Sequence, residues 1–352
     1  MESAESLRGA MESLLGSPHL DRVSPNGFIH YRCPFCEDTG THLGVCYSGT
    51  AFPIGLWSCL RCGVKGAGPS NLARALGLKL PDHPDAVKVP VVEEVLRLDR
   101  PQLWQAWQKI AESAGLSSEH GDMLLKRGIE SEYTPGWFTM PPTEVLQARA
   151  RFLGGRYAEA ASLWSGDPET GRPMGFSRPG RLGLLYPALE GEEGRYLSSY
   201  QQGDAKKILR PRGVSTRGML YYRGIPGEPL VVTEGEIKAE ASWQAGISTL
   251  GLLGVSNSHF ECIQQVKELR PPSVTILFDT DPGGNVSVDM CATRFAARLR
   301  LELGEDCPLL RRMRLKEIDA GKKVDIDSFI AYYALQGGLS AAREKYRNEV
   351  LR

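Results

Sequence analysis

Short apolar runs alternate with helix-length amphipathic segments in the last third of the chain. The runs "PLVVTEG", "ISTLGLLG" and "SVTILFD" begin at residues 229, 247 and 273, and "EIKAEASWQAG" and "SHFECIQQVKEL" lie between them. Continuous apolar runs are typical of strands that are buried on both faces, and their alternation with helices is typical of a parallel sheet. This pattern predicts a Rossmann-like parallel sheet with flanking helices, which a fourth run, "PLLRRMRL", extends.

The rest of the chain has a different pattern, so we predict an α/β multidomain protein. The segment "LPDHPDAVKVPVVEE" has three prolines and no helical apolar period, which indicates a linker. Gly- and Arg-rich strand-like pieces mixed with short helices follow it, which indicates a mixed α+β unit. The predicted parts are an N-terminal domain that holds five of the eight cysteines (1–80), a linker (81–100), a basic subdomain (101–227), the parallel sheet (228–335) and a helical tail (336–352).

Charge changes this picture only locally. Lys and Arg together number 42, as do Asp and Glu, so the average charge predicts no partner. Between Arg172 and Arg223, however, ten Lys or Arg face four Asp or Glu, which predicts a basic surface for a nucleic-acid backbone or a triphosphate. No run of about 18 apolar residues occurs, so we expect a soluble cytoplasmic protein without a membrane partner.

The cysteines indicate a zinc site. Four of the eight form two C-x-x-C pairs, Cys33 with Cys36 and Cys59 with Cys62, and 22 residues separate the pairs. This spacing is typical of a structural zinc ribbon in which four thiolates bind the ion tetrahedrally. We expect Cys46, inside the ribbon, to be a buried small hydrophobe.

Aromatic and basic residues cluster around the two cysteine pairs. Tyr31, Phe35, Trp57, Arg61 and Lys65 would suit base stacking combined with phosphate contacts. A purely structural role for the ribbon is the alternative. We favour nucleic-acid binding and name Trp57, Arg61 and Lys65 as the contacts.

Carboxylates follow two of the predicted strands. Glu234 ends "VVTE", and Asp279 and Asp281 end "ILFDTD". Functional residues of parallel sheets gather at the carboxyl ends of strands, and Mg²⁺ prefers such hard oxygen ligands. Asp325 and Asp327, which follow the fourth strand, could add outer ligands. The alternative is that Asp279 and Asp281 cap a turn before "PGGN" and that Glu234 caps a helix.

These residues carry a family resemblance. "VVTEGEIKA", "ILFDTDPGGN" and "VDIDSF" resemble the TOPRIM domain, and "LLKRGIESEYTPGW" upstream resembles the first half of a DnaG-type RNA polymerase domain. With the cysteine ribbon, residues 25 to 335 resemble DNA primases of the bacterial and phage type. The resemblance implies catalytic roles for Glu234, Asp279 and Asp281, and Mg²⁺ or Mn²⁺ bound by these three with Asp325 and Asp327.

The resemblance also implies nucleic-acid or nucleotide contacts in the basic subdomain, and two positions depart from the family pattern. The implied contacts are Arg195, Lys206, Lys207 and Arg210. Lys238 stands where many members carry an acidic residue. Cys36 stands where bacterial chromosomal members often have His, and in this the chain resembles the phage or plasmid branch.

The implied function is synthesis of short RNA primers on single-stranded DNA from nucleoside triphosphates during DNA replication. The chain has no G-x-x-x-x-G-K-[ST] motif, so we expect a replicative helicase to act in trans in the bacterial cell. Two alternatives stay open: a TOPRIM nuclease that uses the same carboxylates, and a catalytically silent RecR-like mediator of recombination.

Overall fold

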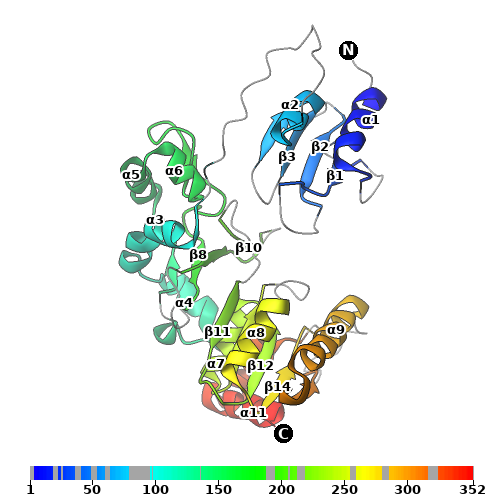
Figure 1. The fold of residues 1–352 in the computed structure, drawn as a ribbon. Helices are drawn as coiled ribbons and strands as arrows, with labels where there is room; N and C mark the ends of the chain where they lie inside the picture. The colour runs from blue at the N-terminus through cyan, green and yellow to red at the C-terminus, as the bar shows by residue number, and fades with distance from the viewer. Residues whose placement is uncertain are drawn as a thin grey trace.

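The structure of the chain is a computed structural model that has three parts along the sequence, coloured blue, cyan to green, and yellow to red in Figure 1. It describes residues 4–18, 23–24, 27–35, 41–48, 54–59, 64–78, 96, 98–134, 136–187, 195–204, 207–211, 219–253, 259–279, 285–315 and 324–351. None of the helices within these ranges combines the length and apolar character that a membrane-spanning helix needs.

The N-terminal part is a small antiparallel sheet with two helices. The strands are β1 (Phe28–Tyr31), β2 (Leu43–Cys46), β3 (Leu56–Cys59) and β4 (Lys65–Ala67), and they pair in chain order. Helices α1 (Ala4–Leu15) and α2 (Pro69–Ala75) contribute Leu7, Met11 and Leu72 to one core with the strands. Cys33 follows β1, and Cys59 is the last residue of β3.

The middle part combines helices with a second antiparallel sheet. The sheet has the order β10-β9-β8-β5, and the strands are β5 (Phe138–Thr139), β8 (Leu182–Leu185), β9 (Leu197–Tyr200) and β10 (Ile208–Leu209). A short turn of 3-10 helix, η1 (Ser131–Tyr133), precedes β5 in the chain. A hairpin of β6 (Trp164–Ser165) and β7 (Arg172–Pro173) lies between β5 and β8. The helices are α3 (Arg100–Ser113), α4 (Ser118–Leu125), α5 (Thr143–Leu153) and α6 (Gly155–Ala160).

Local sequence explains where the longest of these helices begins and which face it buries. Asp99 caps α3 in a reciprocal capping box with Gln102, which satisfies backbone N–H groups that the helix itself leaves free. Leu103, Trp107 and Ile110 recur at helical spacing and are buried. The Trp107 indole donates a hydrogen bond of 2.9 Å to the Ala161 carbonyl, so the polar end of this buried ring is satisfied.

The C-terminal part is the predicted parallel sheet, with one strand more than the apolar runs supply. Its order is β11-β13-β12-β14-β15, and its strands are β11 (Leu220–Arg223), β12 (Leu230–Glu234), β13 (Ser248–Leu252), β14 (Ser273–Ile276) and β15 (Leu309–Arg312). All neighbours are parallel except β11, which runs antiparallel to β13 and precedes the predicted start of this domain at residue 228.

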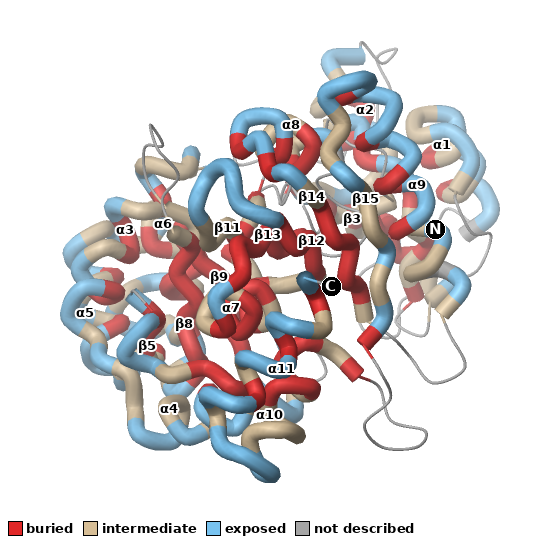
Figure 2. Tube along the Cα trace, turned by 90° about the horizontal axis from the view of Figure 1, so that it is seen from below, coloured by how far each residue is buried: buried red, intermediate tan, exposed pale blue. Residues whose placement is uncertain are grey.

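Helices cover both faces of this sheet. They are α7 (Glu236–Gln244), α8 (His259–Leu269), α9 (Val286–Leu303), α10 (Ile326–Gly337) and α11 (Leu339–Leu351); a 3-10 turn, η2 (Gly304–Asp306), follows α9. Val231 of β12 packs in the core that holds α7, α10 and α11, whereas Leu230 and Val232 pack in the core that holds α8 and α9. The buried strands at the centre of Figure 2 follow from this alternation.

The middle and C-terminal parts share one hydrophobic core. The cluster that contains Trp107 and Leu184 continues through Tyr221 to Phe329 and Tyr346. The carboxyl ends of the parallel strands are therefore held against the middle part by continuous packing.

Candidate active site

Two predicted carboxylates meet at the carboxyl edge of the parallel sheet. Glu234 is the last residue of β12, and Asp279 follows β14, the parallel neighbour of β12. The Asp279 backbone N–H donates a hydrogen bond of 3.0 Å to Glu234 Oε1, so the two positions are in direct contact. Asp281, the third predicted catalytic residue, lies outside the described residues.

A lysine lies beside these carboxylates. Gly235 takes φ 82° between β12 and α7, a conformation that favours glycine, and the tight turn places Lys238 in the first turn of the helix. The Lys238 ammonium forms an ion pair with Asp279 Oδ1 and lies 3.8 Å from Asp325 Oδ2. The lysine thus links the strand-end carboxylates to the acidic pair at the start of α10.

Asp325 caps the helix that carries Asp327. Asp325 Oδ1 accepts a hydrogen bond of 3.1 Å from the Ser328 N–H, and Ser328 Oγ accepts one from the Asp325 N–H. Asp325 is therefore the N-cap residue of α10. Its second oxygen still faces Lys238, so capping does not exclude a role in the site.

Asp327 is buried and only half satisfied. Its Oδ2 lies 2.9 Å from an Arg127 Nη, and its Oδ1 is buried with no hydrogen-bond partner among the described residues. Burial, together with the negative charge of Asp325, raises the pKa of the Asp327 carboxyl to about 7, against the attraction of Arg127. Burial also acts to raise the pKa of Asp325, but its hydrogen bond with Asp327 and the charge of Lys238 outweigh burial and lower it.

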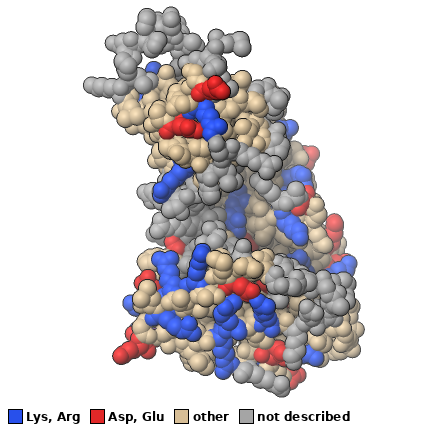
Figure 3. All heavy atoms as spheres, turned by 90° about the vertical axis from the view of Figure 1, so that its right-hand side faces the viewer, with Lys and Arg blue, Asp and Glu red and all other residues tan. Residues whose placement is uncertain are grey.

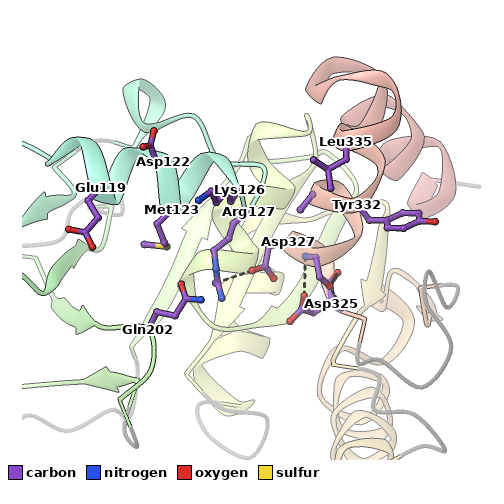
Figure 4. A pocket seen from close by; sticks show the side chains of 12 residues that line it. Glu119, Asp122, Met123, Lys126, Arg127, Gln202, Asp325, Asp327, Tyr332 and Leu335 are labelled. Atoms are coloured by element: carbon purple, nitrogen blue, oxygen red, sulfur yellow. Dashed lines mark hydrogen bonds and ion pairs between the residues drawn. The ribbon is translucent and has the colours of Figure 1, made fainter.

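A cleft of about 770 Å³ opens beside the acidic pair (Figure 4). Helix α4 and the residues just after it line one side, and α10, from its N-cap as far as Leu335, lines the other. The charged lining residues are Glu119, Asp122, Lys126, Arg127, Asp325 and Asp327. This volume lies in the range of about 300 to 1,000 Å³ that small-molecule sites occupy.

Arg127 is a functional candidate that the sequence analysis did not single out. It follows α4 and reaches across to α10, where its guanidinium pairs with Asp327 and lies 5.4 Å from the Tyr200 ring centroid. Its signal in the sequence is its place in "LLKRGIESEYTPGW", but a basic residue at a helix C-terminus is also favourable for the helix alone.

Glu236 and Glu240, which flank Lys238 in the sequence, lie on another face of α7. Both are fully buried. Tyr186 and Ser198 donate hydrogen bonds to Glu236, and Tyr221 donates one of 2.8 Å to Glu240. Glu236 thus connects α7 to the middle part, Glu240 connects it to β11 of its own sheet, and neither lines the cleft.

The four predicted basic contacts differ in their surroundings. Lys206 lies outside the described residues, and Lys207 is exposed beside β10. The Arg195 guanidinium lies 5.6 Å from the Trp104 ring centroid, in a cation–π arrangement. Arg210 lies 3.8 Å from the buried Glu236 carboxylate, so an internal charge already offsets its own.

A second basic surface was not predicted. Figure 3 shows Lys and Arg side chains gathered around acidic ones on the lower part of the molecule, which holds α9 and β15. Asp289 of α9 pairs with Arg312 at 3.3 Å and with Arg314, and Arg294 and Arg298 are exposed nearby on α9.

Only some of the residues predicted for the zinc ribbon lie within the described part of the chain. Cys33 and Cys59 are both buried, while Cys36, Cys62 and Arg61 lie outside the described residues. Lys65 is exposed on β4. The prediction that Trp57 stacks on a base is wrong, because its ring is 0% exposed and packs in the core against Phe35.

The donor chemistry of the sheet edge fits a hard divalent ion. Within the described ranges, no three His, Cys, Asp or Glu side chains already converge as a metal cage. The unpartnered, buried Asp327 Oδ1 nevertheless offers a carboxylate oxygen that a cation would satisfy. The raised pKa of Asp327 means that an ion bound there would displace a proton.

Comparisons with known proteins identify the fold. The crystal structure of the Aquifex aeolicus primase zinc-binding and RNA polymerase domains matches with a TM-score of 0.51 and 17% identity, over 99% of this chain and 86% of that chain. A DnaG primase catalytic domain bound to ssDNA gives 0.52 and 18%, over 70% and 78%. A structure of the DnaG catalytic core gives 0.50 and 19%, over 70% and 79%.

The comparisons of sequence gave no match. No family model matches the chain, and no curated protein matches it. Because the identities are below 20%, the likeness concerns the fold, which is that of DnaG-type primase structures.

Proposed function

We propose that this chain, which has the fold of DnaG-type primase structures, is a DNA primase that makes short RNA primers on single-stranded DNA. The observation that carries the proposal is the contact between Glu234 and Asp279 at the sheet edge, linked through Lys238 to Asp325 beside a cleft. Nucleotidyl transfer needs carboxylates that bind divalent ions, because the ions offset the negative charge of the reacting phosphates.

Glu234, Asp279, Asp325 and Asp327, with Asp281, would hold Mg²⁺ or Mn²⁺. The ion would lower the pKa of the attacking 3′-hydroxyl and offset charge on the triphosphate. The protein's own contribution is position: the strand ends fix Glu234 and Asp279, and the capping box fixes Asp325. Arg127, which reaches into the cleft, would orient the triphosphate.

The N-terminal sheet would hold a structural zinc ion through Cys33, Cys36, Cys59 and Cys62, and would hold the template beside Lys65 and Arg61. Exposed Lys207 and half-buried Arg195 of the middle part would contact the template backbone. We further propose that the protein acts with a replicative helicase in trans in the bacterial cytoplasm. Its gene would belong to a phage or plasmid.

Incorporation of labelled nucleotides on mixed-sequence single-stranded DNA with Mg²⁺ or Mn²⁺ tests this function. We expect short products from the wild-type chain and none from Asp279→Asn, since the amide removes a ligand charge. Asp289→Asn, an acidic residue on α9 outside the cleft, is the matched control and should keep activity. Circular dichroism would verify that both variants fold.

Two outcomes would contradict the proposal. Equal synthesis by the Asp279→Asn variant would remove the carboxylate site from the chemistry. Loss of the input DNA without new products would indicate a nuclease that uses the same carboxylates.

A further inference from the structure

Lys238 is held inside the carboxylate cluster rather than at its rim. Its side chain is 17% exposed, its ammonium contacts Asp279, and Asp325 Oδ2 lies 3.8 Å away. The two neighbouring carboxylates attract the ammonium, and this attraction stabilises its position between them. The ammonium therefore lies between two carboxylates of the proposed metal site.

The backbone fixes this position. A Cβ atom built on Gly251 of β13 would lie 2.6 Å from the Gly235 carbonyl oxygen and 3.1 Å from Ala239 Cβ. The first turn of α7 thus packs directly on the neighbouring strand. Its inner face is held further by the hydrogen bonds of buried Glu236. Lys238 cannot leave the cluster without a change in its rotamer or in this packing.

The described charges around the ammonium are mainly those of carboxylates. Lys238 pairs with Asp279 and lies near Asp325, whereas Arg127 pairs with Asp327. Between Asp279 and Asp325, Lys238 therefore already supplies the positive charge that a divalent ion would bring there.

We propose that Lys238 is a built-in cation that takes the place of one divalent ion between Asp279 and Asp325. This inference rests on the proposed metal-dependent function. The cluster then binds one Mg²⁺ or Mn²⁺ ion, and the ammonium supplies the positive charge between Asp279 and Asp325. A covalently attached cation does not dissociate, so this half of the site is always occupied.

Counting bound Mn²⁺ on the zinc-loaded, full-length chain by electron paramagnetic resonance tests the inference. We expect about one Mn²⁺ per chain for the wild type and for Lys238→Arg, which keeps a cation. For Lys238→Glu we expect about two, because a carboxylate replaces the ammonium and a second ion must offset the charge. Lys238→Met, a neutral side chain of similar length, should bind additional Mn²⁺ and covers the case in which the glutamate variant does not fold.

Lys267→Met, at an exposed position near the end of α8, is the matched control and should bind as the wild type does. The role of Lys238 would be overturned if the wild type bound two Mn²⁺ ions and Lys238→Glu bound the same number. Loss of both ions in Asp279→Asn would show that the metal site itself is intact in the wild type. Absence of Mn²⁺ binding in the wild type would overturn both this inference and the metal-dependent function.

Discussion

At the scale of single residues, the cleft depends on a charge pair that crosses from the middle part to the C-terminal part. Arg127 pairs with Asp327 at 2.9 Å, and the Asp327 side chain is 5% exposed. Removing one partner of such a pair leaves an uncompensated buried charge, which is far more damaging than exchanging cations. The informative substitution is therefore one that keeps the charge and changes the geometry.

Arg127→Lys should keep the fold and weaken synthesis by about tenfold to a hundredfold, because lysine lacks the planar fork that can bind a carboxylate and a phosphate together. Steady-state kinetics over a range of nucleotide concentrations would measure the loss. Arg151→Lys, at an exposed pair with Glu169 on α5, is the matched control. Unchanged kinetics in Arg127→Lys would exclude Arg127 from nucleotide orientation.

Glu240 gives stability a pH dependence that can be isolated. Burial raises the pKa of its carboxyl, and the charge of Arg223 and hydrogen bonds from Gln244 and Tyr221 only partly oppose burial. Between the ordinary pKa of a glutamate and this raised one, the folded state binds more protons than the unfolded state. Its contribution to stability is therefore lost as pH rises through that window.

We expect the free energy of unfolding of the wild type to fall, relative to Glu240→Gln, as pH rises from about 4.5. Urea unfolding of both proteins across this range would measure the difference. Glu302→Gln, at a partly exposed position on α9, should give a curve parallel to that of the wild type. Parallel curves for Glu240→Gln as well would contradict the raised pKa.

Residue contacts could be predicted only where sheet geometry fixes them. The meeting of Glu234 and Asp279 follows from two parallel strands that end at the same edge. The Arg127–Asp327 pair could not be predicted, because it joins residues 200 positions apart through the packing of two parts. The burial of Trp57 was missed for a related reason: the sequence does not say which face of a short strand is covered.

At the scale of elements, continuous apolar runs and turn signals predicted the strands of the parallel sheet well. The strand β11 was missed as a member of this sheet, because "LYYR" lies in a basic, aromatic stretch and joins antiparallel at an edge. The core of the N-terminal sheet follows from the alternation of side chains along its strands. Ile29 and Tyr31 of β1 are buried, and Phe28 and His30 are half-buried.

The ribbon makes a prediction that separates a zinc ligand from a buried thiol. Cys59→Ser should lose most bound zinc as measured by atomic absorption, because a hydroxyl is a much poorer zinc ligand than a thiolate. Cys46→Ser should keep its zinc, since the Cys46 thiol donates a hydrogen bond of 3.3 Å to the Ser48 carbonyl and a hydroxyl can do the same. A full complement of zinc in Cys59→Ser would remove this cysteine from the ligand set.

At the scale of the whole molecule, the charge balance conceals two basic surfaces. The chain has a formal net charge of zero, yet exposed cations lie beside β10 in the middle part and on α9 and β15 in the C-terminal part. In the second surface, Asp289 pairs with Arg312 and Arg314, which offsets part of their charge. In the first, Lys207 is exposed beside one end of β9, and half-buried Arg195, before the other end of β9, lies over the Trp104 ring. We therefore expect the first surface to dominate binding of a single-stranded template.

This expectation concerns the dependence of affinity on salt. The logarithm of the binding constant for single-stranded DNA should fall linearly with the logarithm of salt concentration, since each contacted phosphate releases counterions. Lys207→Ala and Arg195→Ala should each make the slope shallower by about 0.7, and Lys267→Ala, on α8, should leave it unchanged. Fluorescence anisotropy with a labelled oligonucleotide at several salt concentrations would give the slopes. A slope near zero in the wild type would contradict phosphate binding altogether, whereas an unchanged slope in both variants of the middle part would move the template to the surface on α9 and β15.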